Sequence, residues 1–154
     1  MPACVSMSPI AFATPPIPKV TNAPAITQSN PMWMASQLPL SRWGYTEEEF
    51  FIEGNANIYK ALTAPAEITS TVPYKTRILV RRPADTRRYS GNIVLEPIHP
   101  GRTVPALATT FRWIYGNGDV WVGVEPPGNI PFLQQYNPTR YASLTPVPNL
   151  TVHD

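Results

Sequence analysis

Proline constrains the fold of this chain more than any other residue type. Twenty of the 154 residues are proline, about 13%, whereas about 5% is usual. Proline breaks helices and cannot donate a hydrogen bond to a sheet ladder, so regular elements must be short and separated. Seven prolines lie in residues 1–31, where Lys19 is the only charged residue. We therefore expect an irregular proline-rich arm over residues 1–31 and a folded region over residues 32–154.

The length and charge of the chain limit its class. A chain of 154 residues fits a single domain that can bury a core. The net charge of +2 is too small to indicate a nucleic-acid partner or a membrane surface. Cys4 is the only cysteine, so no disulfide can form within the chain. The chain has no run of 18 apolar residues, so the sequence predicts no membrane span. It shows no clear signal peptide, so the localisation stays open.

Several short apolar runs predict strands. Residues 50–52 are strand-like, and Gly54-Asn55 after them is typical of a turn. Residues 66–72 and 74–82 are two β-rich runs on either side of Pro73, and the second alternates polar and apolar side chains as a half-buried strand does. Residues 93–95 and 119–128 are apolar runs of the kind found in strands buried on both faces.

One helix is clearly indicated between the last two strands. Apolar residues recur there at helical spacing, at Val104, Leu107, Ala108, Phe111, Ile114 and Tyr115. Thr103 is placed to cap this helix, Pro105 suits its first turn, and Gly116 suits its end. Strand, helix and strand in this order form a βαβ unit. The predicted fold class is therefore α/β, with a mixed sheet that is antiparallel at first and parallel afterwards. After Gly128, four prolines predict loops.

The carboxyl ends of the two strands in this unit carry candidate site residues, because ligands bind beyond such ends in open parallel sheets. Glu96 and Glu125 lie at these ends. Two carboxylates could share acid and base roles in glycoside cleavage, in which case Glu96→Gln would abolish that cleavage. Alternatively, each is a solvated charge or pairs with an arginine. His99, in the loop after the first strand, is either a general base or makes an ordinary loop hydrogen bond.

A basic run surrounds the expected hairpin and consists of Lys75, Arg77, Arg81, Arg82, Arg87 and Arg88. Such residues can contact phosphates. However, no tryptophan is interleaved with them, and three glutamates at positions 47–49 offset their charge. We therefore expect a solvated hairpin face and no nucleic-acid partner. No metal-ligand spacing, P-loop, G-x-G-x-x-G or G-x-S-x-G motif occurs, so we expect no metal, no cofactor and no serine nucleophile of that type.

Four segments of the chain resemble the N-terminal part of a family of α/β-hydrolase-domain proteins. They are EEEFFIEGNANIY, PYKTRILVRRPADTRRYSGNIVLE, DVWVGVE and NPTRYASL. They occur in the family's order and spacing from Tyr45 to Leu144, and PYKTRILVRRPAD is the most specific of them. The resemblance implies a partial α/β-hydrolase-like sheet of esterase-type ancestry, in which residues 66–72 and 74–82 are the opening antiparallel strands.

The resemblance also implies a role for the loop after residues 93–96. In this fold that loop supplies one backbone amide of the oxyanion hole, and the matching residues are Ile98 and His99. Pro97 and Pro100 have no N–H and cannot serve. The chain departs from the family pattern at Pro97, His99 and Glu125, where the family has Trp, Asn and Ser. The nucleophile, acid and histidine of a triad would follow Asp154. We therefore assign no catalytic residue and expect a truncated chain without turnover on its own.

Two function classes stay open. The first is a fragment of an esterase-like hydrolase, which would take a small ester as substrate once the rest of the domain is supplied. The second is a non-catalytic binding domain that uses the basic hairpin face or an open sheet edge. With no fifth strand beside residues 93–95, that edge is apolar and unpaired, and we expect self-association through it.

Overall fold

The computed structural model describes residues 17–60 and 67–145. Its centre is a five-stranded sheet in the order β1-β2-β3-β5-β4. The strands are β1 (Lys19–Asn22), β2 (Tyr45–Lys60), β3 (Glu67–Pro83), β4 (Ile93–Pro97) and β5 (Val120–Val124), and the helices are α1 (Pro105–Asn117), α2 (Ile130–Tyr136) and α3 (Pro138–Tyr141). All strand pairs are antiparallel except β4 and β5, which are parallel. The predicted mixed sheet with a parallel βαβ unit is confirmed.

The hairpin of β2 and β3 is longer than the sequence predicts. Gly54 and Asn55 do not form a turn but pair with Tyr74 and Pro73 within the ladder. A side chain at position 54 would meet the Tyr74 ring, because an added Cβ would lie 3.1 Å from the tyrosine hydroxyl. The glycine therefore gives the aromatic ring room on the strand surface. Residues 67–72 and 74–82 belong to one strand, whose antiparallel partner is β2, and residue 66 lies outside the described residues.

Pro73 does not interrupt β3 because of its position in the hydrogen-bond pattern. The carbonyls of Lys75 and Arg77 accept hydrogen bonds from the amides of Thr145 and Glu125, on the side of β3 away from β2. Odd-numbered residues along this part of β3 therefore direct their backbone groups away from β2. Pro73 is one of them, so an N–H at this position would point away from β2. Its absence therefore removes no hydrogen bond between β2 and β3.

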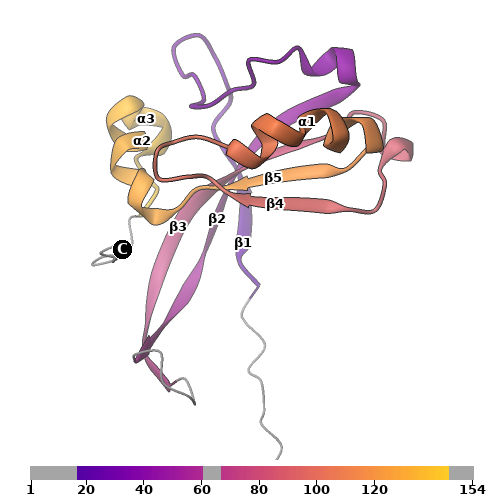
Figure 1. The fold of residues 1–154 in the computed structure, drawn as a ribbon. Helices are drawn as coiled ribbons and strands as arrows, with labels where there is room; N and C mark the ends of the chain where they lie inside the picture. Colours follow the sequence, from indigo (N-terminus) through magenta and orange to yellow (C-terminus); the bar gives the residue numbers. More distant parts are fainter. Residues whose placement is uncertain (1–16, 61–66, 146–154) are drawn as a thin grey trace, which may run out of the picture.

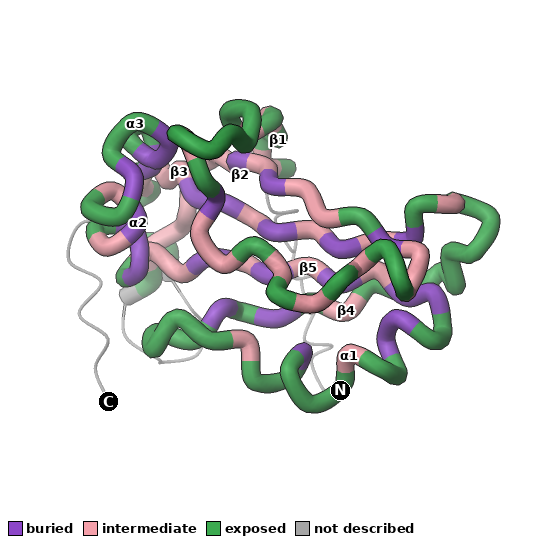
Figure 2. The backbone as a smooth tube through the Cα atoms, turned by 90° about the horizontal axis from the view of Figure 1, so that it is seen from above, coloured by how far each residue is buried: buried purple, intermediate pink, exposed green. Residues whose placement is uncertain are grey.

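The helices α1, α2 and α3 lie on one face of the sheet (Figure 1). One core cluster packs α1 and residues 32–43 onto this face, through Met32, Tyr45, Leu79, Ile98, Leu107, Ile114, Tyr115 and Trp121. A second cluster packs α2 and α3 onto the same face, through Phe51, Ile130, Leu133, Tyr141 and Leu144. Figure 2 shows the buried positions recurring along the central strands and the helices, with the connecting loops exposed.

The opposite face of the sheet is covered by no helix within the described residues. Burial alternates along β5, where Trp121 is buried and Val122 is only half-buried. On β4 the side chains of Ile93 and Leu95 are 62% and 65% exposed. The prediction that these two strands are buried on both faces is therefore wrong for this structure. The strand order also leaves β4 at the edge of the sheet, as the sequence predicts.

Two segments expected to be largely irregular contain regular elements, and residues 1–16 of the expected arm lie outside the described residues. Lys19–Asn22 pairs with residues 50–53 of β2, so part of the proline-rich arm adds an edge strand to the sheet. Beyond Gly128 the chain forms α2 and α3 rather than loops. Pro131 and Pro138 lie in the first turns of these helices. A backbone N–H there has no acceptor within the helix, so its absence in proline costs no hydrogen bond. Prolines therefore start these helices and do not break them.

Candidate functional site

The carboxyl ends of β4 and β5 form the candidate site, and Glu96 is a buried polar group within it. Its Oε1 accepts a hydrogen bond from the amide of Ala106 (2.9 Å), and its Oε2 accepts from the amide of Leu107 (3.0 Å). The same Oε2 accepts from Nε1 of Trp121, 2.9 Å away. Glu96 therefore caps α1 from the neighbouring strand, in place of Thr103. Val104 occupies the N-cap position of α1, and its side chain makes no hydrogen bond.

Backbone amides in the loop after β4 already donate hydrogen bonds to backbone carbonyls. The Ile98 amide donates to the carbonyl of Val124 (2.8 Å) and continues the β4–β5 ladder beyond its last pair. The His99 amide donates to the carbonyl of Thr103 (2.9 Å), and the Arg102 amide donates back to the carbonyl of His99. Neither amide predicted for the oxyanion hole is free in this conformation. Of the two, His99 makes the more local bond, within a five-residue turn.

His99 itself makes a loop hydrogen bond. Its imidazole is exposed, and Nδ1 accepts a hydrogen bond from the amide of Gly101 at 2.9 Å. The neutral tautomer that fits this bond carries its proton on Nε2. Of the alternatives that the sequence allows, the geometry favours the ordinary loop hydrogen bond. Arg102 closes the turn with a positive φ of 60°.

Glu125 lies directly after β5 and ties this loop to the sheet. Its Oε2 accepts hydrogen bonds from Nε and Nη2 of Arg77, at 2.9 and 2.8 Å. Its Oε1 accepts from Nδ2 of Asn129 at 2.7 Å, and the same Nδ2 lies 3.4 Å from the carbonyl of His99. Asn129 therefore joins Glu125 to the loop after β4. The predicted residues Glu96, Ile98, His99 and Glu125 do gather at one edge of the sheet.

The two carboxylates do not face a common open space in this arrangement. Glu96 and Glu125 are both buried, and each oxygen of both groups already accepts at least one hydrogen bond. Glu96 stabilises a helix terminus, and Glu125 pairs with an arginine. The geometry gives the pair separate structural tasks and offers no support for shared acid and base roles in glycoside cleavage.

A buried ionic cluster adjoins Glu125, and we refer to Glu49, Arg77, Glu125, Arg140 and Tyr141 as the ionic cluster. Glu49 accepts from Nη1 of Arg77 at 2.7 Å through Oε1, and from Nε of Arg140 at 2.7 Å through Oε2. The Tyr141 hydroxyl donates to Glu49 Oε1 at 2.9 Å. The four charged side chains are 0–1% exposed. The cluster thus fixes α3 to β2 and β3.

Burial and charge shift two pKa values in the ionic cluster. Burial raises the pKa of Tyr141 to about 12, with a further upward contribution from Glu49 that Arg77 opposes. Burial by itself would lower the pKa of Arg77, but Tyr141, Glu125 and Glu49 outweigh it, so the pKa of Arg77 is raised. At neutral pH the tyrosine is therefore a neutral donor and the arginine is charged.

These contacts correct the prediction of a solvated basic hairpin face. Arg77 and Arg81 are 0% and 6% exposed, because their strand face is the one that α1 and residues 32–43 cover. Arg81 pairs with Glu47, and the more exposed Arg82 and Arg87 pair with Glu48 and Asp85. The signal that could have revealed this is even spacing: Glu47 and Glu49 on one strand, and Arg77 and Arg81 on the next, each lie on a single strand face.

No group of three or more His, Cys, Asp or Glu in residues 17–60 and 67–145 is placed to hold a metal ion. No helix in the same residues is long and apolar enough to cross a membrane. A family model described as an alpha/beta hydrolase domain matches residues 13–153. No curated protein and no solved structure matches the chain.

Proposed function

This chain belongs to the alpha/beta hydrolase domain family, and we propose that it forms the opening part of a carboxylic-ester hydrolase domain without turnover of its own. The observation that carries the proposal is the β4–α1–β5 unit, whose carboxyl edge holds the loop of Ile98 and His99. In this fold that loop faces the acyl oxygen. The sequence supplies no serine in a nucleophile-elbow setting.

Within this proposal, the His99 amide is the better oxyanion donor. Releasing Ile98 would break a bond that continues the sheet ladder, whereas releasing His99 changes only a turn closed by Thr103. A preorganised amide at this point would stabilise the negative charge that develops on the acyl oxygen. The bond from Asn129 to the His99 carbonyl would hold the His99–Pro100 peptide plane, at the start of the turn, in place.

The coding DNA beyond the codon for Asp154 tests the proposal first. We expect the frame to continue into a strand, a G-x-S-x-G-like elbow, and later an acid and a histidine. The 154-residue chain should then hydrolyse a short-chain aryl ester no faster than the heat-denatured chain does, and the longer chain should hydrolyse it. A stop codon with no such motif downstream would overturn the hydrolase proposal.

Two variants of the longer chain separate the backbone of His99 from its side chain. His99→Pro removes the amide and should lower kcat about 10²- to 10³-fold, as loss of one oxyanion donor does. His99→Ala keeps the amide and should retain most of the activity. Equal losses in both variants would assign the role to the imidazole.

A non-catalytic binding domain is the second candidate function. The exposed side chains of Ile93 and Leu95 on the edge strand favour it, because an apolar open edge can pair with another strand. The basic hairpin face gives it little support, since Arg77 and Arg81 are buried. This alternative predicts no ester hydrolysis even when the downstream polypeptide is added.

A further inference from the structure

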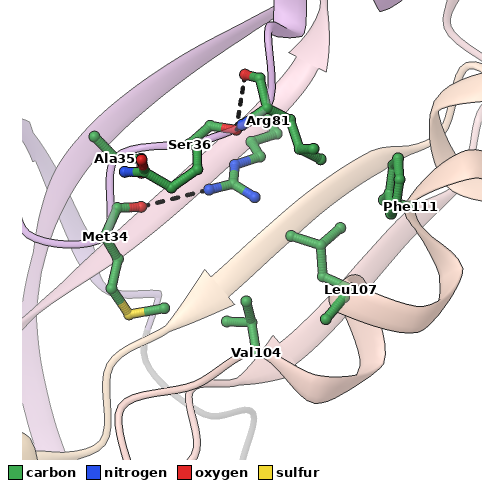
Figure 3. A pocket seen from close by; sticks show the side chains of 10 residues that line it. Met34, Ala35, Ser36, Arg81, Val104, Leu107 and Phe111 are labelled. Atoms are coloured by element: carbon green, nitrogen blue, oxygen red, sulfur yellow. Dashed lines mark hydrogen bonds between the residues drawn. The ribbon is translucent and has the colours of Figure 1, made fainter.

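A cavity of about 460 Å³ lies between residues 34–38 and the first turns of α1. Figure 3 shows Met34, Val104, Leu107 and Phe111 around it, with the guanidinium of Arg81 directed toward it from β3. Its volume is within the usual range for small-molecule sites, which combine apolar walls with a few placed polar groups. None of Glu96, Ile98, His99 and Glu125 lines it.

The cavity wall opposite α1 is held by an ion pair. Nε of Arg81 donates to Oε1 of Glu47 at 2.6 Å, and the other oxygen of Glu47 accepts the Ser36 amide at 2.8 Å. Nη2 of Arg81 lies 3.4 Å from the carbonyl of Met34. The guanidinium carbon also lies 5.0 Å from the ring centroid of Trp121, within the range of a cation–π contact. The cavity is therefore shaped by side chains that are themselves anchored.

Arg81 has unused hydrogen-bond donors. A guanidinium carries five N–H groups, and within residues 17–60 and 67–145 Arg81 donates to one carboxylate and, through a long bond, to one carbonyl. The Tyr115 hydroxyl also lies close enough to Arg81 for the arginine to oppose the rise that burial causes in the pKa of this tyrosine. Arg77, four positions earlier on the same face of β3, is bound by two carboxylates, Glu49 and Glu125. Arg77 is therefore paired with two carboxylates, whereas Arg81 on the same face is paired with one and borders a cavity.

We propose that this cavity binds an unbranched aliphatic carboxylate, whose head group takes the place of a second carboxylate on Arg81. A carboxylate can accept two hydrogen bonds from the guanidinium fork. The apolar side chains of Leu38, Leu107 and Phe111 then contact the aliphatic chain. The site shares no residue with the loop of the proposed hydrolase, so the inference stands whether or not that function holds.

Calorimetric titration of the full chain with octanoate, below its micelle concentration, tests the head-group requirement. Octan-1-ol and octylamine are the comparison ligands, because they have the same chain without the anion. We expect octanoate to bind at least about tenfold more tightly than octan-1-ol, since a charge-assisted hydrogen bond is replaced by a neutral one. Equal affinities for the three ligands, or no binding of octanoate, would overturn the proposal.

Two variants test the location and the role of Arg81 without removing the arginine. Ala108→Phe fills the cavity from an exposed helix position, and should lower octanoate affinity at least about tenfold. Ala106→Phe is its matched control, on the same helix and outside the cavity lining. Glu47→Gln removes the competing carboxylate, and should strengthen octanoate binding severalfold while leaving octan-1-ol unchanged. Binding that Ala108→Phe does not weaken, or that Glu47→Gln does not strengthen for octanoate, would contradict the proposed site.

Discussion

Arg77 and Glu49 form an ion pair that solvent does not reach: Nη1 donates to Oε1 across 2.7 Å, and the two side chains are 0% and 1% exposed. We expect Glu49→Gln to lower the free energy of unfolding by about 3–5 kcal/mol, because it leaves the buried charge of Arg140 without its partner. Urea unfolding followed by circular dichroism measures the change.

The control for this prediction is the neighbouring pair on the same two strands. Glu48 and Arg82 also form a cross-strand ion pair, but their side chains are 37% and 41% exposed. Glu48→Gln should therefore cost only about 0–1 kcal/mol, as exposed ion pairs usually do. Similar losses in the two variants would show that burial does not decide the strength of these pairs.

Two glycines at the end of α1 should respond oppositely to alanine. Gly118 has a φ of 81°, and an added Cβ would overlap the carbonyl oxygen of Arg88. Gly118→Ala should cost at least about 2 kcal/mol, because the left-handed conformation alone costs about 1–2 kcal/mol and the turn at Arg88 must also move. Gly116 is exposed within the helix, with no atom near an added Cβ. Gly116→Ala should therefore stabilise the protein by about 0.5–1 kcal/mol.

Thermal unfolding of the two glycine variants checks this prediction. The melting temperature should fall for Gly118→Ala and rise for Gly116→Ala. A lower melting temperature in both variants would mean that α1 ends before position 116, in contrast to the structure.

The β4–α1–β5 unit could be predicted from sequence because each of its signals is local. Residues 93–95 form an apolar run, and α1 repeats its apolar residues at helical spacing, so neighbouring positions alone identify the elements. The sequence pattern does not predict the helices after Gly128, because proline breaks a helix at most positions. Its effect depends on its place in the turn, and Pro131 and Pro138 both stand in first turns.

The ionic cluster could not be predicted in the same way, because its four charges come from four separate segments. Arg140 follows Glu49 by 91 positions, and only the packing of α3 on the sheet brings them together. The resemblance points to Ile98 and His99 in the loop after β4, and their role there stays a prediction. The hydrogen bonds that occupy their amides depend on the Val124 and Thr103 carbonyls, which no local pattern reveals.

Two buried tyrosines should make the protein sensitive to alkaline pH. Burial raises the pKa of both Tyr45 and Tyr141 to about 12, from an ordinary value near 10. Between pH 10 and 12 the unfolded chain releases these protons and the folded chain keeps them. The unfolded state therefore binds fewer protons, and stability falls as pH rises, by up to about 1.4 kcal/mol per pH unit for each tyrosine. Below pH 10 this contribution is fully present.

Urea unfolding at pH 8 and pH 11 measures the alkaline loss, and Tyr45→Phe should reduce it. The Tyr45 hydroxyl donates to the carbonyl of Asp119 at 2.7 Å, so the variant is also expected to be less stable at pH 8. The diagnostic quantity is therefore the difference between the two pH values. An identical difference in the variant and the natural chain would exclude Tyr45 as a source of the pH dependence.

The open edge at β4 should make the chain associate with itself. Ile93 and Leu95 project from the uncovered face next to an edge whose far side has no strand within the described residues. A long apolar edge recruits other strands, and charged side chains there prevent it. We expect the natural chain to sediment above its monomer mass of 17.1 kDa. The double variant Ile93→Lys with Leu95→Lys should sediment as a monomer.

Trp113→Lys is the matched control for edge association. The Trp113 side chain is 62% exposed, as Ile93 is, but it lies on the outer surface of α1. If exposed apolar area alone drove association, this variant would dissociate the chain as well as the edge variant does. If the edge is responsible, Trp113→Lys should leave the mass distribution unchanged, because the backbone groups of β4 that bind another strand are still open. A monomeric natural chain at micromolar concentration would rule out the edge as an interaction surface between copies.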